Sequence, residues 1–145
     1  MSGVKIRPLR LDEYEEIVSL WHKAGLPIKE NGRESRQALL EQMKNDPEFF
    51  IGAEIDGRLA GVIIASSDGR KGCLNRVAVD PEFRGRGVAA ALTLAAENVL
   101  HQKGIKVIGL LIHRSNLASR ALAKKLGYVE HEDIVYLSKR DSEED

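Results

Sequence analysis

Residues 77–89 decide the fold, and they read Val77-Ala78-Val79-Asp80-Pro81-Glu82-Phe83-Arg84-Gly85-Arg86-Gly87-Val88-Ala89. Asp80-Pro81 ends a strand that we expect over residues 73–79, and a helix is predicted from about residue 87 to residue 103. The basic, glycine-rich turn between them presents backbone N–H groups that lack helical partners, at the positive end of the helix dipole. Such a turn predicts a site for phosphate groups.

The segments before this turn predict two helices and an antiparallel meander of strands. Asp12 is a candidate N-cap of the first helix, whose apolar stripe includes Tyr14 and Trp21. Asp56-Gly57 is a strong signal for a hairpin turn, because both residues tolerate positive φ. The other expected segments are strands over residues 4–9, 49–55, 58–65 and 72–79, and a second helix over residues 34–45.

The segments after the turn predict a parallel unit. Residues 106–112 are almost continuously apolar, which is typical of a strand buried on both faces. Asn116 or the residue before it is expected to cap a further helix to Leu126, and residues 128–129 and 133–137 are expected to form a final hairpin-like return. The predicted fold class is therefore a mixed α/β sheet, with an antiparallel meander followed by a parallel βαβ unit with a right-handed crossover.

Length and composition favour one domain, which we expect over residues 1–138 with a charged tail at residues 139–145. Lys plus Arg and Asp plus Glu both number 22, and a net charge of zero argues against a general nucleic-acid binder. The single cysteine, Cys73, excludes an internal disulfide, and no apolar run is long enough to span a membrane. A cytoplasmic location is expected, and the spacing of the histidines predicts no metal site.

Three kinds of phosphate ligand compete for a turn of this type. A nucleotide-hydrolysing P-loop needs Lys-Ser/Thr after its second glycine, but Val88-Ala89 stands there. A dinucleotide-binding fold needs a parallel unit and an acidic residue at the end of the next strand. Here the preceding strands are expected to be antiparallel, and the next strand ends in Ile112-His113. Coenzyme A is the third ligand.

Two signatures resemble those of the GCN5-related N-acetyltransferase (GNAT) superfamily. The stretch Arg84-x-x-Gly87-x-Ala89 is similar to its acetyl-CoA motif, Gln/Arg-x-x-Gly-x-Gly/Ala. The segment from Asn116 to Leu126-Gly127-Tyr128 resembles its second signature, an Asn-led helix that ends in Leu-Gly-Phe/Tyr. The resemblance covers roughly residues 4–137, and it points to the small bacterial and archaeal members, including those that acetylate ribosomal-protein N-termini.

The resemblance implies acetyl-CoA as the co-substrate and a set of residues that bind it. The pyrophosphate would lie on the backbone N–H groups of residues 84–89, and the pantetheine arm would pair with the strand edge at residues 77–79, where the parallel strands splay apart. A backbone N–H near Val77 would polarise the thioester carbonyl. The implied cofactor-binding residues are Val77, Ala78, Val79, Arg84, Gly85, Arg86, Gly87, Val88, Ala89 and Asn116.

The general acid and base of the family do not carry over to this sequence. The Tyr that serves as the acid in many relatives is matched by Ala123, and the Glu that serves as the base on the fourth strand is matched by Asn75. His113, just past the predicted fifth strand, carries an imidazole and is a candidate base, with a water chain as the alternative. The catalytic residues are therefore left unassigned.

The resemblance implies an N-acetyltransferase in which an amine attacks acetyl-CoA directly. The acceptor would be a protein N-terminus, a lysine or a small amine, bound by the first two helices, the loop at residues 26–32 and the last strands. An acyl-CoA-binding or sensory module without catalysis is the alternative, supported by Ala123 and Asn75. The expected partners are acetyl-CoA and the acceptor, with no nucleic acid and no membrane, and a homodimer stays open.

Overall fold

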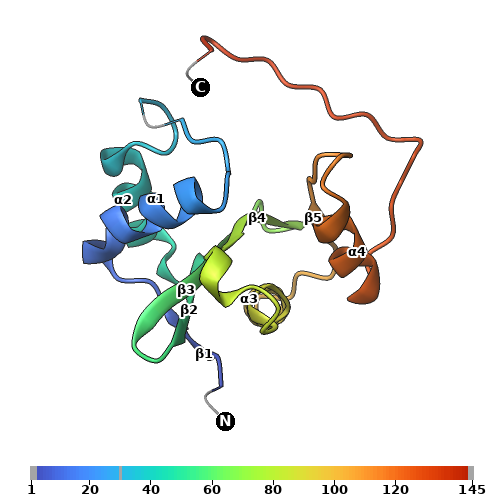
Figure 1. Ribbon diagram of the computed structural model, residues 1–145. Coiled ribbons are helices and arrows are strands. Elements are labelled where there is room, and N and C mark those ends of the chain that lie inside the picture. The colour runs from blue at the N-terminus through green and yellow to red at the C-terminus, as the bar shows by residue number, and fades with distance from the viewer. Residues whose placement is uncertain (1–2, 30, 144–145) are drawn as a thin grey trace.

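The computed structural model describes residues 3–29 and 31–143 and contains a five-stranded sheet in the order β1-β2-β3-β4-β5 (Figure 1). The last two residues of the predicted charged tail lie outside the described residues. In chain order the elements are β1 (Lys5–Pro8), the 3-10 helix η1 (Leu11–Glu13), α1 (Tyr14–Lys23), α2 (Arg36–Asn45), η2 (Pro47–Phe49), β2 (Phe50–Ile55), β3 (Arg58–Ser67), β4 (Gly72–Val79), η3 (Pro81–Phe83), α3 (Val88–Gln102), β5 (Ile108–Leu110) and α4 (Leu117–Lys125).

The strands β1 to β4 form an antiparallel meander, and β5 pairs with β4 in parallel. This topology confirms the predicted fold class. The β2–β3 connection is the expected hairpin turn, with Asp56 at φ 50° and Gly57 at φ 77°. Asp12 does not cap the first long helix, because the chain forms η1 there and Glu13 instead accepts a hydrogen bond from the backbone N–H of Arg10.

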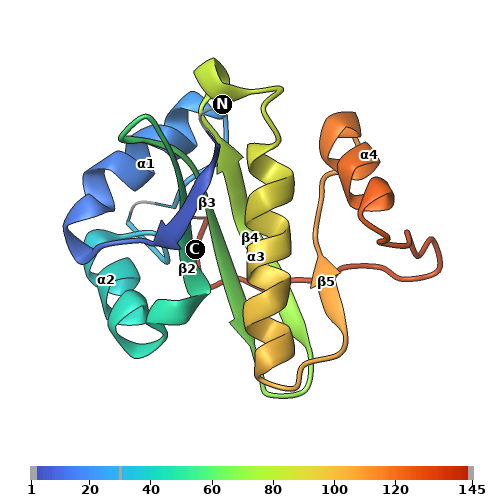
Figure 2. The same ribbon diagram turned by 90° about the horizontal axis from the view of Figure 1, so that it is seen from below.

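Two layers of helices enclose the sheet, with α1 and α2 on one face and α3 on the other (Figures 1 and 2). Trp21 of α1 is fully buried, which confirms its predicted place in the core. The apolar stripe of α3 packs on β3 and β4, as its periodicity predicts. The largest fully buried apolar side chains are those of Trp21, Phe50, Ile17, Ile55, Ile63, Leu92, Leu100, Val62 and Val88.

Two glycines of the sheet let α3 approach the backbone closely. A Cβ atom at Gly61 would lie 2.7 Å from a methyl carbon of Val88 and 2.9 Å from the carbonyl oxygen of Ala78. A Cβ atom at Gly72 would lie 2.7 Å from a methyl carbon of Leu100. The beginning and the end of α3 are therefore both seated directly on the sheet, and this contact fixes the position of the helix N-terminus.

The C-terminal part of the chain differs from the sequence prediction. The expected strand at residues 106–112 is only three residues long, and it is not buried on both faces, since Val107 is 57% and Leu111 is 66% exposed. The expected final hairpin does not form. Residues 129–143, which we name the C-terminal arm, run as an exposed chain instead. An apolar pattern favours a long buried strand only where partner segments cover it, and no described strand pairs with β5 on its outer edge.

Candidate functional site

The site is built where β4 and β5 separate. The two strands pair at three positions only, Gly72 with Ile108, Cys73 with Gly109 and Leu74 with Leu110, whereas β4 continues to Val79. Figure 2 shows β5 diverging toward α4, which stands apart from α3. The splay that the resemblance implied is therefore present, and it leaves backbone groups of β4 beyond Leu74 without β5 as a partner.

A β-bulge lies on the same part of β4. Val62 faces Ala78 and Ile64 faces Asn75, so that Arg76 and Val77 together oppose Ile63. Arg76 has a φ of 53°, a conformation that residues other than glycine adopt rarely. A bulge re-aims the peptide groups next to it, and these are the groups at the open edge of β4.

The basic turn, residues 84–89, follows directly from this strand through η3. Gly85 and Gly87 adopt φ values of 79° and 76°, and α3 begins at Val88. Ala91 donates the first hydrogen bond of the helix, to the carbonyl of Gly87 at 3.0 Å, so the N–H groups before it have no partner inside the helix. A Cβ atom at Gly85 or Gly87 would meet nothing within 4 Å, which leaves open space where a phosphate would lie.

Asp80 is a buried residue that stabilises the chain leading into the turn. The sequence prediction had assigned Asp80 only the role of ending the strand. Asp80 is 5% exposed, and its carboxylate accepts a hydrogen bond from the backbone N–H of Glu82 at 3.0 Å and pairs with Lys23 Nζ at 3.5 Å. The ring of Phe83, also buried, lies under the guanidinium of Arg86 at 5.8 Å. Two buried residues, Asp80 and Phe83, therefore hold the chain that leads into the turn, and Phe83 also contacts Arg86 within it.

Asn116 stands on the far side of the splay, at the start of α4. Its side-chain oxygen accepts a hydrogen bond from the backbone N–H of Ser119 at 3.1 Å, which confirms the predicted N-cap. The other end of the helix is tied to α3, because the hydroxyl of Tyr128 donates a hydrogen bond to Glu97 at 2.6 Å. Burial, together with the carboxylate of Glu97, raises the pKa of Tyr128, so this hydroxyl stays protonated.

The residues considered for proton transfer are not joined to one another by hydrogen bonds. Asn75 lies on β4 with its amide held by Ser66 at 3.1 Å and by the thiol of Cys73 at 3.4 Å. Ala123 is half-buried in α4, and His113 lies exposed on the connection between β5 and α4. The structure therefore supplies no constellation of acid and base from these three positions.

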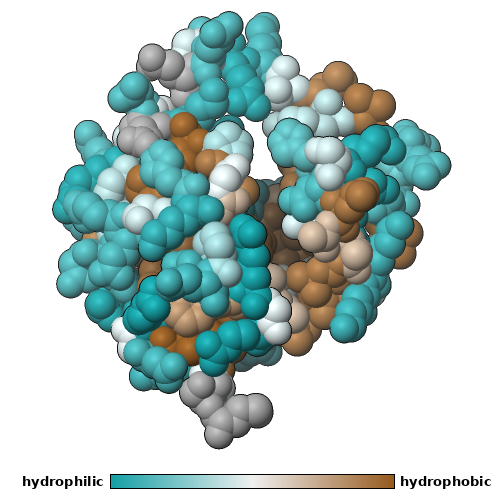
Figure 3. All heavy atoms as spheres, viewed as in Figure 1, coloured by the Kyte–Doolittle hydropathy of each residue, from teal (hydrophilic) through white to brown (hydrophobic). Residues whose placement is uncertain are grey.

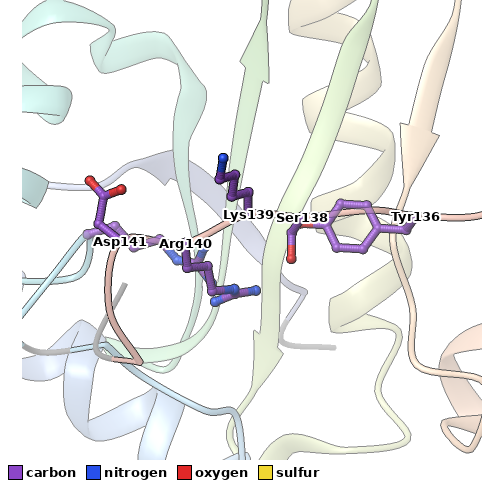
Figure 4. Close-up of a pocket in the computed structure, with 6 residues that line it drawn as sticks. Tyr136, Ser138, Lys139, Arg140 and Asp141 are labelled. Carbon is purple, nitrogen blue, oxygen red and sulfur yellow. The ribbon is translucent and has the colours of Figure 1, made fainter.

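A hollow opens between the side of the molecule formed by α1 and α2 and the side formed by β5 and α4, and Figure 3 shows apolar surface at its base. The C-terminal arm crosses above it and reaches the α1–α2 loop, residues 24–35, where Lys29 Nζ donates a hydrogen bond to the carbonyl of Glu143. The last strands expected to border the acceptor are replaced by this arm. Arg33 lines a pocket with Tyr136, Ser138, Lys139, Arg140 and Asp141 of the arm (Figure 4).

The sequence prediction missed an ion pair near the bulge, formed by the buried Glu34 and the half-buried Arg76. Glu34, 6% exposed, pairs with Arg76 Nη2 at 3.0 Å, and the guanidinium of Arg76 lies 4.7 Å from the ring centre of Trp21. No local sequence pattern predicts this ion pair, because 42 positions separate the two residues in the chain. Only the tertiary fold brings the loop and the strand together.

The described residues, 3–29 and 31–143, include no group of three or more His, Cys, Asp or Glu side chains that could hold a metal ion. Among the same residues, no helix has both the length and the apolar character that crossing a membrane requires.

Comparison with protein families gives a match over most of the chain. The model of the Acetyltransferase (GNAT) family matches residues 10–128. Among curated proteins, the chain is 34% identical over 138 residues to Acetyltransferase plu1384 of Photorhabdus laumondii, covering 94% of this chain and 95% of that protein. It is 32% identical over 137 residues to Acetyltransferase SG1711 of Sodalis glossinidius, covering 94% and 95%.

Solved structures with the same fold include the PaiA N-acetyltransferase of Thermoplasma acidophilum in complex with coenzyme A, with a TM-score of 0.75, 24% identity, and coverage of 86% of this chain and 89% of that one. The structure of AAC(6')-Iy with a bisubstrate analog gives a TM-score of 0.76 at 24% identity, covering 96% and 99%. The ribosomal-protein-S18-alanine N-acetyltransferase of Escherichia coli gives 0.71 at 22% identity, covering 88% and 79%. At these identities the likeness shows the shared fold.

Proposed function

The chain belongs to the acetyltransferase (GNAT) family and is an acetyl-CoA-dependent N-acetyltransferase, and from this premise we propose how its residues bind acetyl-CoA and an amine acceptor. One observation carries the proposal: the open edge of β4 leads straight into a turn with two left-handed glycines at the start of α3. An extended pantetheine chain suits a strand edge, and a pyrophosphate suits a helix N-terminus.

In this proposal the basic turn binds the pyrophosphate through backbone N–H groups. The left-handed glycines at 85 and 87 turn these groups outward, and no side chain of their own fills the space above them. Arg84 and Arg86 add charge-assisted contacts at the exposed rim. The set assigned to acetyl-CoA is Val77, Ala78, Val79, Arg84, Gly85, Arg86, Gly87, Val88, Ala89 and Asn116.

The reaction can proceed without a dedicated acid or base among the side chains. The amine nitrogen bonds to the acetyl carbon, the carbon–sulfur bond breaks with its electron pair on sulfur, and the amine releases a proton to water or to His113. The backbone N–H of Val77, beside the bulge, polarises the thioester carbonyl. A thiol is acidic enough to leave as thiolate without a dedicated acid, so Ala123 and Asn75 are compatible with transfer. The family assignment favours transfer over the binding-only module.

The acceptor enters through the hollow on the other side of β4. Its walls are the α1–α2 loop and the C-terminal arm, which carry charges of both signs, including Lys29, Arg33 and Asp141. This mixture fits a protein N-terminus, a lysine or a small amine. Release of free thiol from acetyl-CoA with a panel of these three classes identifies the acceptor, and tight acetyl-CoA binding without release would support the binding-only module.

The binding proposal is tested by Gly87→Glu, which places a carboxylate where the pyrophosphate would lie. We expect it to abolish acetyl-CoA binding in calorimetry. The matched control is Gly69→Glu, because Gly69 is also left-handed, with φ 90°, and also has open space around it, but lies in the β3–β4 turn. Equal affinities of the two folded variants would contradict the site.

We propose that residues 1–138 form a single acetyltransferase domain, with residues 139–145 as a charged tail. A cytoplasmic location and a homodimer stay predictions from the sequence, and sedimentation analysis at several protein concentrations tests the homodimer.

A further inference from the structure

Glu34, at the end of the α1–α2 loop, connects two other residues of this loop to α1 and to one strand of the sheet. One of its carboxylate oxygens accepts hydrogen bonds from the backbone N–H of Lys29 at 2.7 Å and from Arg76 Nη2 at 3.0 Å, and the other accepts from Arg33 Nε at 3.0 Å. Its backbone carbonyl accepts a hydrogen bond from the hydroxyl of Tyr14 at 2.8 Å. The loop beside the acceptor hollow is thus fastened to β4 through one buried carboxylate.

Arg76 is held in an arrangement that packing alone does not favour. It is the residue of the bulge with positive φ, and glycine is the usual occupant of such a position. Its guanidinium is confined between Glu34 and the ring of Trp21, and its side chain is only 18% exposed. The buried Nε of Arg76 and the buried Nε1 of Trp21 have no hydrogen-bond partner in the part of the chain that the structure describes.

Each of these features opposes folding. Left-handed backbone outside glycine, buried charge and unpaired buried donors all destabilise a native state, and together they occur where the surrounding structure over-determines the conformation. Burial lowers the pKa of Arg76 and the negative charge of Glu34 raises it, so the carboxylate offsets part of the cost of burying this guanidinium. Such strain beside an open strand edge points to a function.

We propose that Glu34 and Arg76 are a pair of positioning residues: by holding the Arg76 side chain against Trp21, Glu34 fixes the left-handed conformation of Arg76 and thereby the direction of the next N–H group, that of Val77. This inference rests on the proposed function, in which that N–H polarises the thioester. Neither side chain touches the reacting atoms in this account. The α1–α2 loop is fixed by the same contact, so loop position and carbonyl polarisation are coupled.

The first experiment separates positioning from stability. We expect Glu34→Ala and Arg76→Met to lower kcat by about 10²-fold, the cost of misplacing one polarising donor, while the Kd of acetyl-CoA stays within about twofold. Arg76→Gly suits the left-handed backbone but lacks the side chain that contacts Glu34 and Trp21. We therefore expect its Tm to equal or exceed that of Arg76→Met, and its kcat to be as low. A wild-type kcat in folded Arg76→Gly or Glu34→Ala would overturn the proposal.

The control is Glu15→Ala, which breaks an exposed ion pair with Arg36 between α1 and α2 and leaves β4 untouched. It is expected to keep the wild-type kcat. A loss equal to that of Glu34→Ala would show that loosening the two helices is enough, and it would overturn a specific role of the buried pair.

A second readout does not depend on turnover. In the free protein, we expect Glu34→Ala to shift the amide resonance of Val77 and to speed its hydrogen exchange, while Glu15→Ala leaves both unchanged. With [13C]acetyl-CoA bound, the same variant is expected to raise the carbonyl stretching frequency toward its value in water. If the resonance and the exchange rate of the Val77 amide are unchanged in Glu34→Ala, the positioning role is overturned. If the wild-type protein binds no acetyl-CoA, the proposed function is contradicted, and the amide measurement still decides whether Glu34 positions Val77.

Discussion

The two parts of this chain on either side of Ile105 differ sharply in packing. Among the described residues, every buried side chain lies at or before Ile105, and α4 has none. The basic turn and β4 belong to the packed part, whereas Asn116 and the C-terminal arm belong to the exposed part. In the proposed function, the acetyl-CoA residues of β4 and the basic turn therefore lie in the packed part, whereas Asn116 and one wall of the hollow lie in the exposed part.

The largest difference is expected between two leucines. Leu92 in α3 is fully buried and Leu117 in α4 is 70% exposed. We expect Leu92→Ala to lower the free energy of unfolding by about 2–5 kcal/mol because it leaves a cavity, and Leu117→Ala to change it by less than about 0.5 kcal/mol. Urea denaturation measures both, and similar losses would break the comparison.

The ion pairs of the packed part give the next prediction. Arg7 Nη2 and Glu13 Oε2 lie 2.8 Å apart, and the Glu13 side chain is 1% exposed. Glu13→Gln removes the buried charge of this pair, but Arg7 is half-buried and keeps Glu54 as a partner at 2.8 Å, so we expect a loss of about 1–3 kcal/mol at pH 7. The exposed pair of Arg58 with Glu82 is the control, and Glu82→Gln is expected to cost less than about 0.5 kcal/mol.

The same pair sets a dependence on pH. Burial alone would raise the pKa of Glu13, but hydrogen bonds from Arg7 and from the backbone of Arg10 bring it below the ordinary value of 4.5. A lowered carboxyl pKa stabilises the fold above the ordinary value, and this contribution is lost as the pH falls through the folded-state value. The gap between wild type and Glu13→Gln should therefore narrow below about pH 4.5 in urea titrations; a gap that widened there would contradict the assignment.

A smaller effect is expected at the junction of the two parts. Tyr128→Phe removes the hydrogen bond to Glu97 and should weaken the attachment of α4 by about 1 kcal/mol. Hydrogen exchange followed by mass spectrometry should show faster exchange in α4 and unchanged exchange in α3. Tyr136→Phe, in the arm, serves as the control. Equal loss of protection in both helices would mean that the two parts unfold together.

The smallest effect is expected from the arm. A chain that ends at Glu130 lacks most of the arm, whose apolar residues are 62–86% exposed, so its free energy of unfolding should stay within about 0.5 kcal/mol of the full chain. Its affinity for acetyl-CoA should also be unchanged. A clear fall in the free energy of unfolding would show that the arm packs on the fold in solution. It would contradict the division of the chain into a packed part and an exposed part.

Sequence prediction succeeded where the determinants are local. The bounds of β4, the hairpin at Asp56-Gly57 and the Asn116 cap follow from turn chemistry and short-range periodicity, and all three are confirmed. The role of the basic turn in binding stays a prediction. Local rules of this kind need no knowledge of what lies across the sheet.

Sequence prediction failed where the local structure depends on distant segments of the chain. The apolar run at residues 106–112 predicts a doubly covered strand, but coverage depends on where the C-terminal residues go, and their own pattern does not specify that. The contact between Glu34 and Arg76 joins a loop to a strand across the fold, and an arginine inside a strand pattern gives no sign of positive φ.

Cys73 gives the separation of β4 from β5 a chemical consequence. It occupies one of the three paired positions of the two strands, it is half-buried, and burial raises the pKa of its thiol. Thiolate is the form that reacts with maleimides, so at neutral pH this side chain should react slowly while the strands stay together. As the chain has no second cysteine, a faster alkylation of Cys73 would report that the two strands separate at this point.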